Sequence, residues 1–281
     1  MRIDAALRAA SARLERSSST TPRLDAEVML AHLLRTTREH LAAYPELRLA
    51  AGPRARFRRQ VAQRAAGVPV AYLTGGKEFY GLPFAVNRRV LIPRPESEAL
   101  VDAVRSRLAS DTPAVIADIG TGCGNLAVAL ARCLPQATVW AVDQSPAALA
   151  VARRNASRLG VRVRFRRGDL LKPLTTVRLD VVVANLPYLA GKPARRTATA
   201  KNAALTYEPA QALYSGCDGL ALYRRLLAQL AQRAQRPQLV ACEMEVRQWP
   251  EFTALAAQSI RHRAWVEHIN GVSIAMLSLA A

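Results

Sequence analysis

An amide side chain and an aromatic ring flank a Leu-Pro pair at Asn185-Leu186-Pro187-Tyr188, directly after the apolar run 179–184. Methylating a planar NH2 group is difficult because its nitrogen lone pair is delocalised. The Asn185 carbonyl and a backbone carbonyl of the Leu-Pro pair can each accept one N–H and align that lone pair with a methyl donor. Such orientation can supply roughly 7–11 kcal/mol. We therefore expect Asn185, Pro187 and Tyr188 to be catalytic, and all four residues to bind substrate.

In this interpretation Tyr188 stacks on the planar group and Pro187 fixes the turn. Electrostatic stabilisation of the cation that develops on nitrogen adds to orientation. An Asn with a Pro close after it also occurs in ordinary turns at the end of a strand. The motif therefore indicates methyl transfer only if a cofactor motif occurs at the matching place in the same fold.

A second segment that could carry chemistry combines an aspartate with three closely spaced glycines, in Asp118-Ile119-Gly120-Thr121-Gly122-Cys123-Gly124. Glycines let the backbone turn tightly and approach a ligand, and a helix N-terminus adds free N–H donors. Asp143, nineteen positions after Gly124, could accept hydrogen bonds from both hydroxyls of a ribose. Asp169 could accept from an adenine amino group, with Leu170 packed on the ring.

Nicotinamide-binding folds use a closely related glycine turn, so the turn alone does not identify the cofactor. Three details favour S-adenosylmethionine. The spacing is G-x-G-x-G rather than G-x-G-x-x-G, Asp118 stands two residues before the first glycine, and Asp169 follows the third predicted strand.

Alternating strands and helices must position these residues after Pro113. We expect helices at 125–133, 146–159 and 220–235, and strands at 115–119, 138–142, 161–165, 179–184, 238–243, 264–269 and 273–279. The run 179–184 is nearly all apolar, as in strands buried on both faces of a parallel sheet. Repeated βα units predict an α/β fold, a Rossmann-like, doubly wound, mostly parallel seven-stranded sheet with its ligand at the carboxyl ends of the strands.

The residues before the sheet predict two further parts. Residues 1–75 predict a small N-terminal helical domain, because leucines from Leu24 to Leu34 recur at helical spacing. Residues 76–92 predict a β-hairpin linker around Gly81-Leu82-Pro83. The catalytic domain is expected to span 93–281.

Composition excludes several classes of protein. None of the apolar runs reaches the roughly 18–20 residues of a membrane span, and arginines interrupt the N-terminus where a secretory signal would be apolar. The four cysteines lie far apart and there are only four histidines, so we expect neither a metal site nor disulfides. A monomeric cytoplasmic protein without a membrane partner is expected.

The net charge of +19 is almost all arginine. Residues 1–92 carry 16 Lys and Arg against 7 Asp and Glu, about half of the excess. A nucleic-acid recognition surface should be clustered. Because the charge is spread along the chain, direct nucleic-acid binding is not the favoured interpretation.

Several segments resemble the peptide chain release factor glutamine N5-methyltransferases, which are class I S-adenosylmethionine-dependent enzymes. The most family-specific segment is Ile92-Pro93-Arg94-Pro95-Glu96. The other similar segments are Arg23–Glu27, Val68–Gly75, Glu78–Leu82, Tyr207–Pro209 and Asp218–Leu220, besides the glycine motif.

The resemblance implies transfer of one methyl group to the side-chain amide N5 of the Gln in the release factor's Gly-Gly-Gln motif. It also implies that the N-terminal domain recognises that protein. The resemblance implies most of the cofactor-binding residues, and the spacing of the motifs adds Asp118 and Asp169. The full expected set is Asp118, Gly120, Thr121, Gly122, Cys123, Gly124, Asp143, Asp169, Leu170 and Asn185.

Two departures leave alternatives open. The family usually has Pro where this chain has Leu186, whereas adenine-N6 rRNA dimethyltransferases carry Asn-Leu-Pro-Tyr. An adenine-N6 methyltransferase acting on RNA or DNA is therefore the alternative. The segment Ala241–Glu245 also lacks the glycine that usually follows in the family. A cofactor-binding module without catalysis, which binds a translation factor, is a third hypothesis. The joint presence of Asp118, Asp143, Asp169 and Asn185 opposes it.

Overall fold

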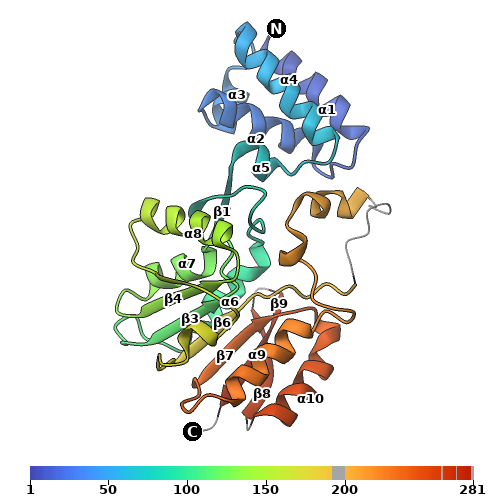
Figure 1. Cartoon of the computed structure of the whole chain (residues 1–281). Coiled ribbons are helices and arrows are strands. Elements are labelled where there is room, and N and C mark those ends of the chain that lie inside the picture. Colours follow the sequence, from blue (N-terminus) through green and yellow to red (C-terminus); the bar gives the residue numbers. More distant parts are fainter. Residues whose placement is uncertain (192–199, 261, 270, 280–281) are drawn as a thin grey trace. The chain divides into compact units, whose positions relative to one another are not determined.

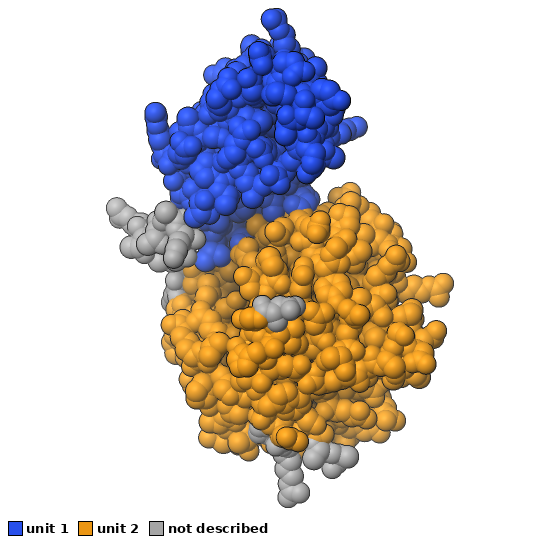
Figure 2. Space-filling model, turned by 180° about the vertical axis from the view of Figure 1, so that it is seen from behind, with its two compact units in different colours: residues 1–76, 194–208 blue, residues 77–193, 209–281 orange. Residues whose placement is uncertain are grey.

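The computed structural model describes residues 1–191, 200–260, 262–269 and 271–279 (Figure 1). The chain divides into two compact units, coloured separately in Figure 2. Residues 1–76 and 194–208 form the first unit, and residues 77–193 and 209–281 form the second. The sequence pattern predicts a helical region at the start of the chain but does not predict that 194–208 belongs with it.

The first unit is helical, as expected. Its helices are α1 (Ile3–Glu15), α2 (Pro22–Leu34), α3 (Arg38–Ala43), α4 (Ala51–Ala65) and α5 (Val70–Thr74). Leu14, Leu30 and Phe57 lie in its buried core. Leu24 is 40% exposed although it begins the predicted apolar stripe, because it lies in the first turn of α2 on the side away from Leu30.

The predicted hairpin is present as β1 (Gly76–Phe79) and β2 (Leu82–Ala85). Tyr80 and Gly81 both have positive φ, 54° and 69°, as a two-residue type I′ turn requires. Asn155, fully buried, donates to the Ala85 carbonyl at 3.0 Å and accepts from the Ala85 amide at 2.8 Å. The hairpin is thereby held to helix α8 (Pro146–Arg158).

The second unit contains a seven-stranded sheet in the order β5-β4-β3-β6-β7-β9-β8. Its strands are β3 (Val115–Ile119), β4 (Thr138–Asp143), β5 (Arg164–Arg167), β6 (Val181–Ala184), β7 (Leu239–Glu243), β8 (His262–Ile269) and β9 (Val272–Leu279). The first five run parallel, and β9 pairs antiparallel with both of its neighbours. The predicted mostly parallel, doubly wound fold is confirmed.

Helices cover both faces of this sheet (Figure 1). Helices α6 (Glu98–Arg105), α7 (Asn125–Cys133) and α8 share one core cluster with Val181 and Val183 of β6. Helices α9 (Ala221–Ala231) and α10 (Trp249–Ser259) share the other with Val182. Alternate residues of β6 are therefore buried in opposite cores, which explains its unbroken apolar sequence.

One predicted strand is shifted in the structure, and one helix of the structure had no counterpart in the sequence predictions. The third strand covers Arg164–Arg167 rather than 161–165, because an edge strand with three arginines has no apolar run to reveal it. Helix α10 was not predicted. Among the described residues, none of the helices is long and apolar enough to cross a membrane.

Candidate active site

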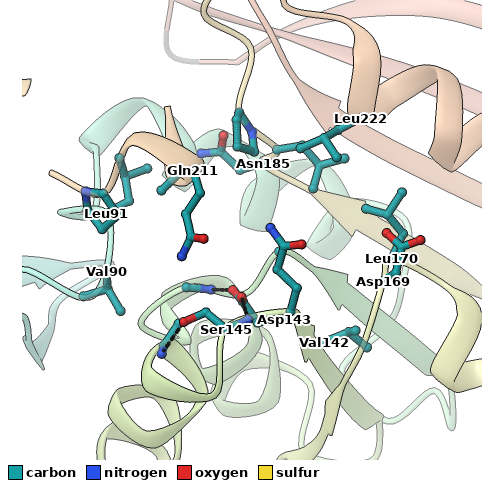
Figure 3. Close-up of a pocket in the computed structure, with 18 of the residues that line it drawn as sticks. Val90, Leu91, Val142, Asp143, Ser145, Asp169, Leu170, Asn185, Gln211 and Leu222 are labelled. Atoms are coloured by element: carbon teal, nitrogen blue, oxygen red, sulfur yellow. Dashed lines mark hydrogen bonds between the residues drawn. The ribbon is translucent and has the colours of Figure 1, made fainter. Parts of the chain in front are cut away.

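A pocket lies at the carboxyl ends of the parallel strands, lined by residues that follow β3, β4, β5 and β6 (Figure 3). Parallel strands place their carboxyl ends at one edge of a sheet, so residues distant in sequence meet there. The predicted site residues that line the pocket are Gly120, Gly122, Asp143, Asp169, Leu170, Asn185, Leu186 and Pro187.

The glycine turn adopts a backbone that other residues rarely take. Gly120, Gly122 and Gly124 have φ values of 78°, 56° and 84°. A Cβ on Gly120 would lie 2.9 Å from the Leu186 Cδ2 atom, and one on Gly124 would lie 3.1 Å from the Ala152 Cβ atom. These glycines therefore serve both the turn and the close packing against β6 and α8.

Backbone amides of the glycine turn and of the start of α8 hold the Asp143 carboxylate in place. One carboxylate oxygen accepts from the Gly122 amide at 2.9 Å, and the other accepts from the Ser145 amide at 2.8 Å. Burial raises the pKa of Asp143, and these amides oppose the rise. Since each carboxylate oxygen can accept two hydrogen bonds, capacity remains for two ribose hydroxyls.

Asp169 and Leu170 lie beside each other at the end of β5 (Figure 3). Burial of Asp169 raises its pKa, but hydrogen bonds from Arg225 and Lys172 outweigh this and lower it, so the carboxylate stays charged. Leu170 has a φ of 52°, in the left-handed region that leucine rarely adopts. Unusual backbone at a binding site is consistent with a side chain positioned for a ligand.

The other predicted site residues do not line the pocket: Asp118, Thr121, Cys123, Gly124 and Tyr188. Asp118 is buried, and its Oδ2 atom accepts from the Thr121 hydroxyl at 2.6 Å and from the Ala127 amide at 3.1 Å. Burial raises the pKa of Asp118 to about 7. The structure thus places Asp118 where it joins the glycine turn to the start of α7.

Asn185 is held in one orientation by two buried side chains. Its Nδ2 group donates to the Ser97 hydroxyl at 2.8 Å and to a Glu243 carboxylate oxygen at 3.0 Å. An ionised carboxylate can only accept, so the NH2 end of the amide must face Glu243. Within the described part of the chain, no donor is recorded to the Asn185 Oδ1 atom, and Asn185 lines the pocket. An acceptor therefore remains for a substrate N–H.

Tyr223 links the ends of β6 and β7 behind this amide. Its hydroxyl donates to the Glu243 carbonyl and accepts from the Leu186 amide at 3.2 Å. Leu186 is 2% exposed and packs against Gly120, although it also touches the pocket. The backbone just after Asn185 is thereby tied to the end of β7 from the protein interior.

Tyr188 is half-buried beside the same network. Burial raises its pKa to about 12, and the charges of Glu243 and Glu245 add to the rise. The phenol therefore stays protonated and cannot serve as a base near neutral pH. The Tyr188 carbonyl accepts from the Gln248 side-chain amide at 2.9 Å, and Gln248 also donates to the Asp218 carbonyl at 3.0 Å.

Sequence comparisons agree with this geometry. A "PrmC N-terminal domain" model matches residues 5–75, and a "Methyltransferase small domain" model matches residues 96–217. The release factor glutamine methyltransferase of Moorella thermoacetica is 43% identical over 251 residues, which cover 87% of this chain and 86% of that protein. The chain belongs to the release factor glutamine methyltransferase family.

Other relatives support the same assignment. The release factor glutamine methyltransferase of Xylella fastidiosa strain 9a5c is 42% identical over 80% of this chain and 78% of its own length. A methyltransferase structure from Pyrococcus furiosus has a TM-score of 0.52 at 16% identity, covering 82% of this chain and 98% of that one, and shows the fold alone. The expected family resemblance is confirmed. The chain is accordingly a methyltransferase that uses S-adenosylmethionine.

Four side chains around the site were not predicted from the sequence, namely Ser97, Tyr223, Glu243 and Gln248. Ser97 directly follows the family-specific Pro-Arg-Pro-Glu segment, and that position was the available signal. Glu243 lies in the segment noted only for its missing glycine. Leu91, at the start of the segment that resembles the family, also lines the pocket, as do Arg89, Val90 and Gln211, which had no sequence signal. No group of three His, Cys, Asp or Glu side chains in the described residues could hold a metal ion.

Gly219 permits the contact between Tyr188 and Gln248, and Gly219→Ala is expected to break it. A Cβ at this position would lie 2.0 Å from the Tyr188 carbonyl oxygen and 2.5 Å from the Gln248 Nε2 atom, at a φ of 83°. Gly81→Ala is the matched control, because its φ is 69° and nothing lies within 4 Å of the added atom.

Urea unfolding should show Gly219→Ala about 1–3 kcal/mol less stable than the control variant, and methyl transfer should fall with it. Equal stabilities for the two variants would contradict the packing described here.

Proposed function

We propose that this chain transfers a methyl group from S-adenosylmethionine to the side-chain amide N5 of the Gln in the Gly-Gly-Gln motif of peptide chain release factors. The observation that carries the proposal is the orientation of Asn185, whose NH2 end is held by Glu243 and Ser97. This leaves a carbonyl acceptor on the pocket side, which suits a planar NH2 substrate. The names of the relatives indicate the substrate.

Different residues of the pocket would bind the cofactor and the substrate. When bound, S-adenosylmethionine supplies an electrophilic methyl group. Asp143 would accept from the ribose hydroxyls, and the glycine turn lets the backbone approach the cofactor closely. Leu170 would pack on the adenine ring.

Asn185 would accept one N–H of the substrate amide, and a backbone carbonyl of the Leu186-Pro187 segment would accept the other. This orientation accounts for activation without a strong base. Tyr188, kept neutral by burial, would provide an aromatic wall for the planar group. The proton would leave after transfer, when the methylated nitrogen is acidic.

We further propose that residues 1–75 recognise the release factor, that 76–92 link the domains and that 93–281 catalyse. The family-model match over residues 5–75 supports the first assignment. Action as a monomer in the cytoplasm belongs to the same proposal, since release factors work in translation.

The test is transfer of labelled methyl from S-adenosylmethionine to purified release factor, compared with total rRNA. Label is expected in the release factor and not in a release factor whose Gly-Gly-Gln glutamine is replaced by alanine. Label found only in RNA would overturn the proposal in favour of the adenine-N6 alternative. Absence of label in either, with cofactor bound, would indicate a module without catalysis.

Leu186, which keeps the nucleobase alternative open in the sequence, is buried against Gly120 and Tyr223. Leu186→Pro restores the usual family residue and removes one N–H···O bond, worth about 1 kcal/mol. Glutamine methylation should therefore stay within about tenfold of wild type. The measurement is kcat/KM on release factor. Tyr223→Phe is the comparison variant, which keeps Leu186 and removes both this bond and the bond from the Tyr223 hydroxyl to the Glu243 carbonyl. Adenine methylation present in wild type and lost in Leu186→Pro would contradict this.

A further inference from the structure

The fold brings an arginine-rich segment of the sequence together with Arg132 of α7. Residues 144–168 contain seven arginines and no Asp or Glu. In the fold, this segment forms α8 and the edge strand β5, and together with the end of α7 and the start of β4 it surrounds a hollow of about 900 Å³. Four exposed arginines line the hollow: Arg132, Arg153, Arg162 and Arg164. None of its sixteen lining residues is acidic.

These four arginines differ from the arginines of the second unit that pair with carboxylates. Arg224 pairs with Asp218 and Glu251, and Arg225 pairs with Asp169. In contrast, no ion pair joins any of the four hollow arginines to a carboxylate of the described residues. Their charge is therefore available to an external polyanion.

Aromatic rings hold some of the guanidinium groups at this edge. Arg153 lies 5.4 Å from the centre of the Phe165 ring, and Arg164 and Arg166 lie 5.3 and 5.0 Å from the centre of the Trp140 indole. A guanidinium held over a ring loses less conformational freedom when it binds, and its planar fork matches a phosphate. The edge thus combines pre-positioned cations with a partly exposed aromatic residue.

We propose that this hollow binds single-stranded RNA. Arginines would contact the phosphates, and unpaired bases could stack on Phe165 and on guanidinium planes. Three neutral polar side chains, Gln136, Thr138 and Ser157, line the same hollow and could hydrogen-bond the 2′-hydroxyls that DNA lacks.

Arginines on an edge strand also discourage strand pairing between molecules. That role does not explain Arg132 and Arg153, which lie on α7 and α8 rather than on the strand. The hollow is at the start of β4, which contributes Thr138, whereas Asp143 at the other end of β4 lines the cofactor pocket. RNA bound here would leave the active site open, so methyl transfer and RNA binding can be measured separately.

The test uses the full-length protein and a fluorescently labelled single-stranded RNA of about 20 nucleotides, followed by anisotropy at several salt concentrations. The variant is Arg132→Gln/Arg162→Gln, since neither residue is recorded in an ion pair, hydrogen bond or ring contact with described residues. The charge-matched control is Arg56→Gln/Arg59→Gln on the exposed side of α4.

We expect the variant to bind at least tenfold more weakly than wild type and the control to bind within about twofold. Loss of two phosphate contacts should also reduce the salt slope by about 1.4, at roughly 0.7 per phosphate. Deoxy-oligonucleotide of the same sequence should bind more weakly than RNA. Cofactor binding and methyl transfer to release factor should stay within about twofold in the variant.

Equal weakening in variant and control would show that only net charge matters and would overturn the proposal. Failure of wild type to bind the RNA, or preferential binding of polyglutamate over RNA at the hollow, would also overturn it. The second outcome would identify an acidic protein segment as the occupant.

Discussion

Asn185→Ala is expected to lower kcat for glutamine methylation by about a hundred- to a thousandfold, the usual effect of removing one positioned hydrogen-bonding group from an active site. The substitution removes the acceptor that would orient the substrate NH2. Cofactor affinity should stay within about tenfold, because Asp143 and the glycine turn are untouched. Steady-state kinetics and calorimetric titration with S-adenosylmethionine measure the two effects.

Asn185→Asp tests whether the volume of the side chain at this position is enough for activity or whether the orientation of its amide is required. It keeps an acceptor oxygen and nearly the same volume, but it places a second carboxylate opposite Glu243, where the amide now donates. We expect it to lose activity as severely as Asn185→Ala. Thermal unfolding of both variants serves as the folding control. Activity that survives in Asn185→Ala with an intact fold would refute the amide clamp.

Glu243→Gln is expected to have the second large effect. Its kcat should fall about tenfold, and its KM for release factor should change little. Ionised Glu243 can only accept, and so fixes the NH2 end of Asn185. A glutamine offers a donor as well as an acceptor, so both orientations of Asn185 become possible. Glu243 is therefore a positioning residue that acts through Asn185.

The pH profile distinguishes this role from a purely structural one. Burial raises the pKa of Glu243, while hydrogen bonds from Ser97 and Asn185 oppose the rise. Wild-type kcat should fall as the pH decreases through this raised pKa, because protonated Glu243 can donate to Asn185 and reverse the amide. Glu243→Gln should lack this acid limb. Glu251→Gln, at an exposed carboxylate, is the control and should keep it.

The stability of the folded protein should change with pH in the direction opposite to kcat. A raised folded-state pKa means that the contribution of Glu243 to stability is fully present at low pH and is lost as the pH rises through that pKa. Relative to Glu243→Gln, wild type should therefore gain stability over the same acid range in which it loses activity. Chemical unfolding at several pH values measures the difference. A shared acid limb in wild type and Glu243→Gln would contradict the proposed role.

The order of the central elements could be predicted because each carries a local signal. Apolar runs mark β3, β4, β6 and β7, and Gly120–Gly124 mark a tight turn with positive φ. Parallel strands place their carboxyl ends at one edge, so the convergence of Asp143 and Asn185 followed from the predicted topology. Strand β5 was misplaced because an edge strand rich in arginine lacks that signal.

The orientation of Asn185 could not be predicted in the same way. It depends on Ser97 and Glu243, which lie 88 and 58 positions away in sequence and come from the segment before α6 and from the end of β7. Hydrogen bonds between such distant residues depend on how packed elements meet, and no local pattern records this.

The position of the positive charge on the surface likewise depends on both the sequence and the fold. Composition determined a strongly basic chain, and the arginine-rich segment 144–168 did not by itself predict a particular surface. Only the fold brings Arg132 of α7 to the same hollow as Arg153 of α8 and Arg164 of β5, because β5 pairs with β4 and packs against α8, which contacts α7. The sequence by itself determined the reaction class, through the glycine turn and Asn185. The tertiary structure decided which side chains orient that amide and where unpaired positive charge collects.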